Sequence, residues 1–235
     1  MAVHVGCCGF PVNRSTYFTH LDTVEIQQTF YSPPRLTTAR KWRHQAPATF
    51  DFSIKAWQLI THPASSPTYR RLREPLDGPP EAYGFFRPTE YVWKAWERTQ
   101  EIAEALGARW IIFQCPRSFT PTTEHIGNLR KFFKRIRERH WRLGWEPRGE
   151  WPSDVVQSLC QELDIIHVVD PFLQLPVTEN LAYFRLHGIG GYRYRYTQED
   201  LSRLKSWTEP YDESWVMFNN VSMWHDAIQF KRFVL

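Results

Sequence analysis

The sequence predicts an α/β fold in which eight parallel strands alternate with helices and close into one barrel. Eight short apolar runs follow one another along the 235 residues, and each ends at a polar or charged residue. Most of the runs are continuously apolar, as is typical of strands that are buried on both faces of a parallel sheet. Helical stretches separate them, which favours parallel strands joined by crossover helices. Eight such units predict a TIM-type (β/α)8 barrel, with an open doubly wound sheet as the alternative.

The eight runs define the expected strands. We expect them at residues 3–6, 23–27, 50–56, 110–114, 143–146, 165–170, 183–187 and 215–220. The helices are expected at about 37–45, 89–106, 122–139, 153–163, from 197 onward and 225–233. Thr89 is a suitable N-cap and Gly107 a suitable C-terminal stop for the second of these. Residues 171–180 leave little room for a helix, so we expect one or two helices to be short or replaced by loops.

We expect one domain over residues 1–235, interrupted by a long proline-rich loop at about 61–88 that carries Arg70, Arg71 and Arg73. A loop of this length within a compact domain is usually functional or mobile. No G-x-G-x-x-G motif follows a strand, which disfavours a dinucleotide-binding sheet.

Composition narrows the class of protein. The chain is 42% apolar and 16% aromatic, which suits a large core, and its net charge of +4 is too small to indicate nucleic acid by itself. The four cysteines form no C-x-x-C pair, which favours reduced thiols in the cytosol. We find no signal peptide and no apolar run of the roughly 20 residues needed to span a bilayer. The protein is therefore expected to be soluble and cytoplasmic, without a membrane partner.

The polar residues that end the strands form the candidate site. In TIM-type barrels the active site lies at the C-terminal ends of the strands. Proline directly follows Glu146 and Asp170, and it stops both strands because it has no N–H to donate. The strand ends together supply Glu25, Lys55, Gln114, Glu146, Arg148, Asp170, Arg185, His187 and Asn219. A structural alternative is that Glu146–Arg148 and Asp170–Arg185 are ion pairs that only hold the barrel mouth together.

A glycine-rich turn follows the seventh strand, where phosphate sites often lie in these barrels. The segment from Gly188 to Gly191 can form a nest of N–H groups for an anion. The adjacent YRYRY run at 192–196, with Tyr194 at its centre, suits stacking and phosphate contact. An ordinary turn followed by an exposed ribbon is the structural alternative.

Three other interpretations remain open. Glu25, Glu146, Asp170 and His187 are suitable ligands for a divalent metal, although three cations crowd the same mouth. A non-catalytic nucleic-acid binder could use the basic residues of the helix at 122–139, namely Lys131, Lys134, Arg135, Arg137 and Arg139. Cys7 and Cys8 end the first strand, but no histidine partner for a nucleophilic cysteine can be identified.

Six stretches resemble the YecE-like family, the domain of unknown function 72, in its archaeal form. They are VEIQQTFY at 24–31, KAWQLITH at 55–62, WEPRG at 145–149, VDPF at 169–172, FRLHG at 184–188 and FNN at 218–220. The resemblance implies a TIM barrel, and a relation to endonuclease IV and xylose isomerase would imply phosphodiester or sugar chemistry. The metal ligands of those enzymes do not carry over as a set. Asp226 and Gly149 replace an asparagine and a histidine that are common in the family.

We therefore expect an anion-binding pocket and acid–base or hydrolytic chemistry on a phosphate-bearing or nucleotide-like substrate. Glu146 is the expected general acid or base, with His187 and Asp170 completing the catalytic set. The other candidates would bind the substrate, with Arg148, Arg185 and Lys55 neutralising its negative charge. No cofactor is required by the sequence, a divalent metal and nucleic acid are allowed, and the oligomeric state is left open.

Overall fold

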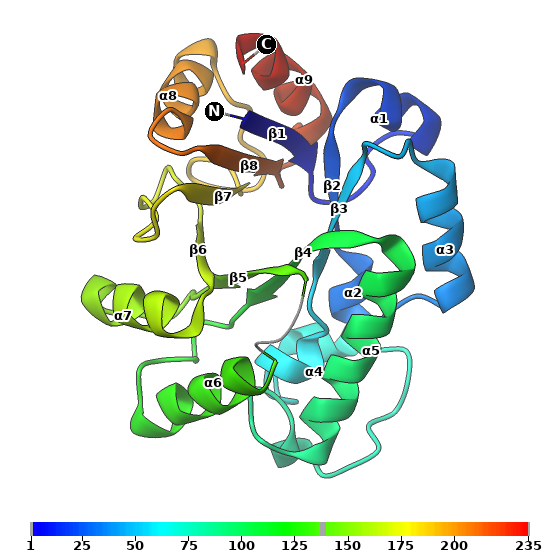
Figure 1. Cartoon of the computed structure of the whole chain (residues 1–235), viewed down its shortest axis with the longest axis vertical. Coiled ribbons are helices and arrows are strands. Elements are labelled where there is room, and N and C mark those ends of the chain that lie inside the picture. Colours follow the sequence, from blue (N-terminus) through cyan, green and yellow to red (C-terminus); the bar gives the residue numbers. More distant parts are fainter. Residues whose placement is uncertain (1, 137–139, 235) are drawn as a thin grey trace.

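The protein folds as a closed barrel of eight parallel strands, as the sequence predicts. This computed structural model describes residues 2–136 and 140–234. Each strand pairs with the next in sequence, and the first pairs with the last to close the ring (Figure 1). The strands are β1 (Ala2–Cys7), β2 (Thr23–Ile26), β3 (Asp51–Lys55), β4 (Ala108–Gln114), β5 (Arg142–Glu146), β6 (Ile166–Val169), β7 (Leu181–Leu186) and β8 (Glu213–Phe218).

Helices surround the ring of strands (Figure 1). They are α1 (Arg14–His20), α2 (Gln28–Tyr31), α3 (Leu36–Gln45), α4 (Gln58–Thr61), α5 (Glu90–Leu106), α6 (Thr123–Arg135), α7 (Ser153–Leu163), α8 (Gln198–Thr208) and α9 (Met223–Val234). As expected, two of them are single turns, and the described chain between β6 and β7 forms turns instead of a helix.

The helix ends follow the local capping signals. The Thr89 hydroxyl accepts the Val92 N–H at the start of α5, and Gly107 ends that helix with a left-handed φ of 59°. Thr197 and Asp200 form a capping box at the start of α8. The expected extension of α6 to Arg139 falls on residues 137–139, which lie outside the described residues. Helices α1, α2 and α4 are absent from the sequence prediction, because four to seven residues are too few to show a clear apolar stripe.

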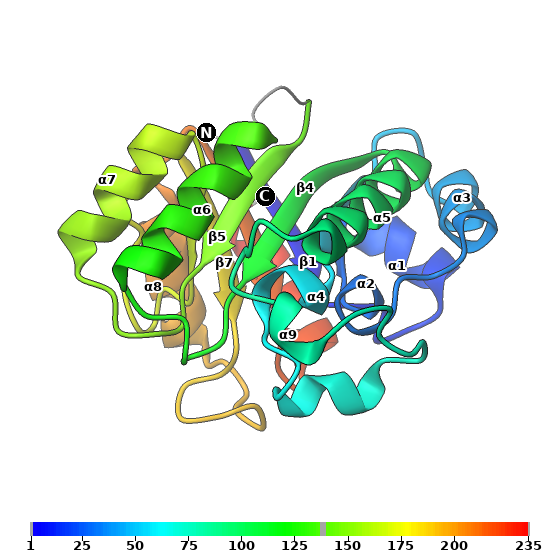
Figure 2. The same ribbon diagram turned by 90° about the horizontal axis from the view of Figure 1, so that it is seen from below.

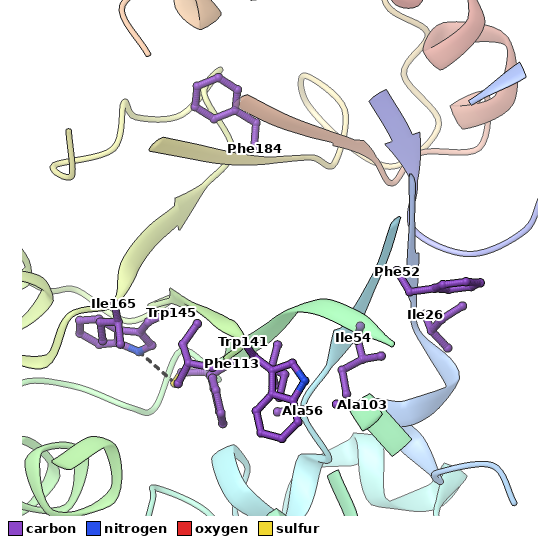
Figure 3. Packing of buried hydrophobic residues seen from close by; sticks show 14 of the residues in the cluster. Ile26, Phe52, Ile54, Ala56, Ala103, Phe113, Trp141, Trp145, Ile165 and Phe184 are labelled. Atoms are coloured by element: carbon purple, nitrogen blue, oxygen red, sulfur yellow. Dashed lines mark hydrogen bonds between the residues drawn. The ribbon is translucent and has the colours of Figure 1, made fainter. Parts of the chain in front are cut away.

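Alternation along the strands produces two separate cores. Side chains such as Ile54, Phe113 and Phe184 point outward and pack against the helices (Figure 3). Side chains of the opposite parity fill the inside of the barrel. The inner cluster is Cys8, Trp110, Ile112, Val168, Tyr183, Trp215 and Met217.

Three aromatic rings plug the barrel below the strand ends. The ring of Trp110 lies 4.9 Å from that of Tyr183 and 5.8 Å from that of Trp215, and all three side chains are fully buried. Aromatic side chains of this size bury large areas and favour such edge-to-face contacts. The inner residues above this plug therefore face only the C-terminal end of the barrel.

Two long connecting segments, one after α4 and one after β7, lie at the C-terminal end of the barrel (Figure 2). Figure 2 shows the chain after β7 and the chain after α4 projecting from the side to which the arrows of β4, β5 and β7 point. The 61–88 segment contains two short 3-10 helices, η1 (Pro67–Arg71) and η2 (Pro80–Ala82). Within the described residues, no helix has the length and apolar character needed to cross a bilayer.

Candidate functional site

The inward parity of the strands brings most of the predicted residues together. On β7, Tyr183 belongs to the inner aromatic plug, so Arg185, two positions later, also points into the barrel. Glu25 of β2 and Glu146 of β5 reach the same level and contact Arg185 directly. The strand ends thus converge as the sequence predicts.

Arg185 is the centre of the cluster and is fully buried. Its Nε donates to Oε2 of Glu25 at 3.0 Å and its Nη2 to Oε1 of the same carboxylate at 2.8 Å. Its Nη1 donates to Gln114 Oε1 at 3.1 Å and also to Glu146. The guanidinium therefore directs its donors to protein groups from β2, β4 and β5 and ties these strands to β7.

The two carboxylates determine the charge state of the cluster. Burial opposes the charge of Arg185, but Glu146 and Glu25 outweigh it and raise the pKa of Arg185 well above its usual value. Burial by itself would raise the pKa of Glu146, yet Arg185 and then Arg148 lower it to about 2. Glu146 is therefore ionised at neutral pH, and the cluster is a buried ion network that requires all its members.

Two residues outside the predicted set complete the ion network. The Tyr183 hydroxyl donates to Glu25 Oε2 at 2.9 Å, and the Gln27 amide donates to the other oxygen of Glu25. Tyr183 lies two positions before Arg185 on β7, and Gln27 lies two positions after Glu25, directly after β2. The period of two along a strand could have identified them.

A polar chain leads from this network to the rim. Arg148 donates through Nε to Glu146 at 2.9 Å and through Nη2 to Nε2 of His187 at 2.6 Å. Because Arg148 can only donate, His187 carries its proton on Nδ1, which lies 3.4 Å from Asp170 Oδ2. The Arg148 side chain is 36% exposed, so this chain connects the buried cluster to solvent.

Of the two ion pairs in the structural alternative, Glu146–Arg148 is present. Asp170–Arg185 is not, because Asp170 pairs with His187 and Arg185 pairs with Glu25 and Glu146. The backbone N–H of His187 donates to Asp170 Oδ2 at 2.9 Å, and that of Phe172 donates to Oδ1 at 3.1 Å. These bonds orient the carboxylate toward the imidazole.

Lys55 lies at the end of β3 and differs from the other cations of the mouth. Its side chain is buried, and Nζ lies 3.6 Å from the centre of the Phe30 ring. Within the described part of the chain, it forms no ion pair with a carboxylate. Burial, followed by the positive charge of Arg185, lowers its pKa to about 7, although Glu146 and Glu25 act in the opposite direction.

His62 follows α4 and contacts the same aromatic ring. Its ring centre lies 4.9 Å from that of Phe30, and the Thr61 hydroxyl lies 2.8 Å from its Nδ1. Burial and then the charge of Lys55 lower its pKa to about 3, so His62 is neutral at pH 7. His62 is not among the predicted site residues, because it comes seven residues after the strand end, beyond a helical turn.

The remaining predicted residues lie apart from the Arg185 cluster. The Tyr194 hydroxyl donates to Asp200 of α8 at 2.7 Å. Gly188 has a φ of +92°, and its N–H donates to the Tyr196 hydroxyl at 2.9 Å. The backbone N–H of Asn219 donates to Leu186 at 2.8 Å, and its side chain is partly exposed at the end of β8. In the glycine-rich turn, the N–H of Gly188 is thus already bonded to the protein.

Cys8 lies inside the ion network. Its Sγ is 3.6 Å from Glu25 Oε1 and 3.9 Å from Arg185 Nη2. Burial, with the negative charge of Glu25, raises the pKa of this thiol well above its usual value. A thiolate nucleophile is therefore disfavoured here, because the reactive form is the ionised one.

The donor set at the mouth does not fit a divalent metal. Among the described residues, no group of three or more His, Cys, Asp or Glu side chains is placed to hold an ion. Glu25 and Glu146 contact different edges of the Arg185 guanidinium. A metal ion between them would have to displace a buried cation that already neutralises both carboxylates.

Some of the basic side chains of α6 make contacts within the protein. Lys134 pairs with Glu162 of α7 at 2.7 Å, and the guanidinium of Arg135 lies 4.0 Å from the ring centre of Trp93. Lys131 is exposed, whereas Arg137 and Arg139 lie outside the described residues. The described part of this helix therefore offers few free cations to a nucleic acid.

Comparison with known proteins places the chain in a family. Residues 13–234 match the family model described as "Protein of unknown function DUF72". The UPF0759 protein YunF of Bacillus subtilis (strain 168) is 24% identical over 245 residues, which cover 88% of this chain and 79% of YunF.

Solved structures share the barrel. A DUF72 family protein of Enterococcus faecalis V583 has a TM-score of 0.76 at 21% identity and covers 99% of this chain and 97% of its own. A xylose isomerase domain containing protein of Salmonella typhimurium LT2 has a TM-score of 0.56 at 11% identity, over 90% of this chain and 85% of its own. Endonuclease IV of Thermus thermophilus has a TM-score of 0.55 at 11% identity, over 98% of both chains. These likenesses show a related fold, and the match over residues 13–234 shows that the chain belongs to the DUF72 family of proteins of unknown function.

Proposed function

We propose that the protein is an enzyme that performs acid–base or hydrolytic chemistry on a small anionic substrate at the C-terminal end of the barrel. The substrate class is phosphate-bearing or nucleotide-like, as the sequence suggests. Lys55 takes up and releases the proton. The observation that supports this most strongly is a buried amine next to an ion network, without a carboxylate partner among the described residues.

The environment of Lys55 is suited to proton transfer at neutral pH. A general base works best when its pKa is near the working pH, and burial is a common way to lower a lysine into that range. With a pKa of about 7, a large fraction of Lys55 is neutral and can accept a proton from carbon, oxygen or water. An ordinary lysine, with a pKa near 10.5, would be almost fully protonated and unable to do so.

The other residues then take supporting roles. Glu146 is the general acid or base expected from the sequence, but a carboxylate with a pKa of about 2 rarely holds a proton at pH 7. We assign it to orient Arg148 and Arg185 and to balance their charge. Arg148 is an exposed cation at the mouth, and His187, which pairs with Asp170, is placed to orient or shuttle a proton there.

We also propose the finer assignments that the sequence suggests. The six motifs favour a YecE-like, archaeal-type member of the DUF72 family. Cytoplasmic action is supported by the four cysteines, which are all free and buried. Nucleic acid is a less favoured partner, because three of the four lysines and arginines in α6, Arg130, Lys134 and Arg135, make intramolecular contacts.

The test is turnover of defined compounds in deuterated water. Sugar phosphates and nucleoside monophosphates are incubated with the protein and followed by proton and phosphorus NMR, which detect C–H exchange and phosphate release. We expect turnover of at least one compound and its loss in Lys55→Met and Lys55→Arg. Lys131→Met, at an exposed position on α6, is the matched control and should keep full activity.

Two results would contradict the proposal. Turnover that survives Lys55→Met would remove Lys55 from the chemistry. Failure of the whole panel, with folded protein confirmed by circular dichroism, would contradict the substrate class.

A further inference from the structure

A polar pocket lies against α2, the single-turn helix whose Phe30 contacts Lys55. It has a volume of about 300 Å³, which is at the small end for ligand sites. Phe30 of α2 covers Lys55, whereas the neighbouring Tyr31 faces the pocket. The residues that line it are Gln27, Gln28, Tyr31, Ser32, Arg71 and Arg73.

The lining is cationic and holds many hydrogen-bond donors. It includes two guanidinium groups, two side-chain amides and two hydroxyls, and no carboxylate. Within the described part of the chain, neither Arg71 nor Arg73 forms an ion pair. These features suit an anion with several oxygens, because guanidinium groups bind phosphate in a bidentate manner.

The pocket is held in place by local structure. The guanidinium of Arg71 lies 3.5 Å from the centre of the Tyr31 ring, a cation–π contact that favours this position of the side chain. Leu72, at the end of η1, has an extended backbone, so Arg71 and Arg73 lie on one side of the chain. Leu72 itself lines a different pocket, as this alternation requires.

Gln27 connects the pocket to the buried cluster. It lines the pocket and donates its side-chain amide to Glu25, the main partner of Arg185. A ligand bound at Arg71 and Arg73 would therefore lie against the residue that adjoins the ion network.

We propose that this pocket binds the phosphate group of a phosphomonoester, with Arg71 and Arg73 as its main ligands and the reacting part of the molecule directed toward the barrel mouth. Binding of phosphate by the pocket stands on its own geometry. Only the direction of the rest of the ligand rests on the proposed function.

The test is calorimetric titration with inorganic phosphate at pH 7 and low salt. Wild-type protein should show one saturable site, and Arg71→Gln or Arg73→Gln should weaken binding at least tenfold. Tyr31→Leu, which removes the stacking ring but no charge, should weaken it by a smaller factor. Arg70→Gln is the matched control, because Arg70 is exposed on the same 3-10 helix but does not line the pocket, and it should stay within twofold.

The proposal fails if phosphate shows no saturable binding or if Arg70→Gln weakens it as much as Arg71→Gln does. It also fails if Arg148→Gln abolishes binding while the Arg71 and Arg73 variants retain it, because the anion would then sit at the barrel mouth. Lys55→Met should bind phosphate within twofold of wild type. Loss of the proposed chemistry and loss of the phosphate pocket are therefore separate outcomes.

Discussion

At the residue scale, the proposed chemistry depends on how the charge of Lys55 is balanced. Arg185 and Arg148 lower the pKa of its amine, whereas Glu146 and Glu25 raise it, and burial is the largest influence. These groups come from β2, β5, β7 and the residues just after β5. Removal of the charge of any of these groups should therefore shift the pKa of Lys55.

Removal of the Glu146 charge should shift the Lys55 titration. Glu146→Gln takes away a carboxylate that favours the protonated amine, so the pKa of Lys55 should fall below about 7. The midpoint can be measured from the ¹⁵N shift of Nζ as a function of pH, with Lys55→Met to assign the signal. Glu150→Gln, at an exposed position nearby, is the control, and an unchanged midpoint in Glu146→Gln would contradict the network described here.

The buried amine should also make stability depend on pH. Its pKa is about 7 in the folded protein and near 10.5 as a free lysine, so the unfolded chain binds more protons between these values. The free energy of unfolding should therefore rise with pH across this interval by up to about 1.4 kcal/mol per unit, relative to Lys55→Met. Urea unfolding of both proteins at pH 7, 8 and 9 measures the difference, and parallel curves would refute it.

The sequence predicts which residues reach the mouth and offers the local pair Glu146–Arg148, but it does not predict the partners of Arg185. Proline stops and the period of two are local signals, and they place Glu146, Asp170 and Arg185 at strand ends. Which carboxylate meets Arg185 depends on the stagger of β2, β5 and β7 around the ring, which no local pattern specifies. For this reason Arg185 pairs with Glu25 and Glu146, and Asp170 pairs with His187.

At the element scale, the 61–88 segment is attached to the barrel by an unusual turn. Gly84, Phe85 and Phe86 all have left-handed φ angles, of 78°, 53° and 54°. Their N–H groups donate to the carbonyls of residues 59–61 in α4, at 2.9–3.2 Å. The segment thus folds back onto the helix that follows Lys55.

Substitution at Gly84 should loosen this attachment. A Cβ there would lie 2.3 Å from the His62 carbonyl, and the φ of +78° is unfavourable for any other residue. Gly84→Ala should lower the free energy of unfolding by at least about 1–2 kcal/mol. Gly127→Ala, within α6 where a Cβ meets nothing within 4 Å, should instead stabilise by about 0.5–1 kcal/mol. Urea unfolding compares the two, and equal effects would show that Gly84 is not required for the turn.

The elements themselves were predictable where caps and apolar stripes are strong. Thr89 and Gly107 bound α5 as expected from their residue types. The 61–88 segment was recognisable as a long basic loop, but its η1 turn and its contact with Tyr31 arise from tertiary packing. The pocket formed by Arg71 and Arg73 was therefore not visible in the sequence.

At the scale of the whole molecule, Arg185 joins four strands of a barrel whose interior is closed by Trp110, Tyr183 and Trp215. Removal of this single side chain leaves two buried carboxylates without their main counter-charge. The residues proposed to support the chemistry therefore also stabilise the barrel. The three aromatic rings fill the barrel interior below them.

Loss of the Arg185 charge should destabilise the entire barrel. Arg185→Met should lower the free energy of unfolding by about 3–5 kcal/mol at pH 7, because Glu25 and Glu146 stay buried without it. The double variant Arg185→Met with Glu25→Gln should recover part of the loss. Urea unfolding measures both, with Arg193→Met at an exposed position as the control. A loss below about 1 kcal/mol would mean that the ion network contributes little to stability.

The most direct test of the central claim is the pH titration of the Lys55 amine in the intact protein, read from the ¹⁵N shift of Nζ. We predict a midpoint near pH 7. A midpoint near the ordinary lysine value of 10.5 would contradict this claim, because Lys55 would then be a permanent cation and could not serve as the base.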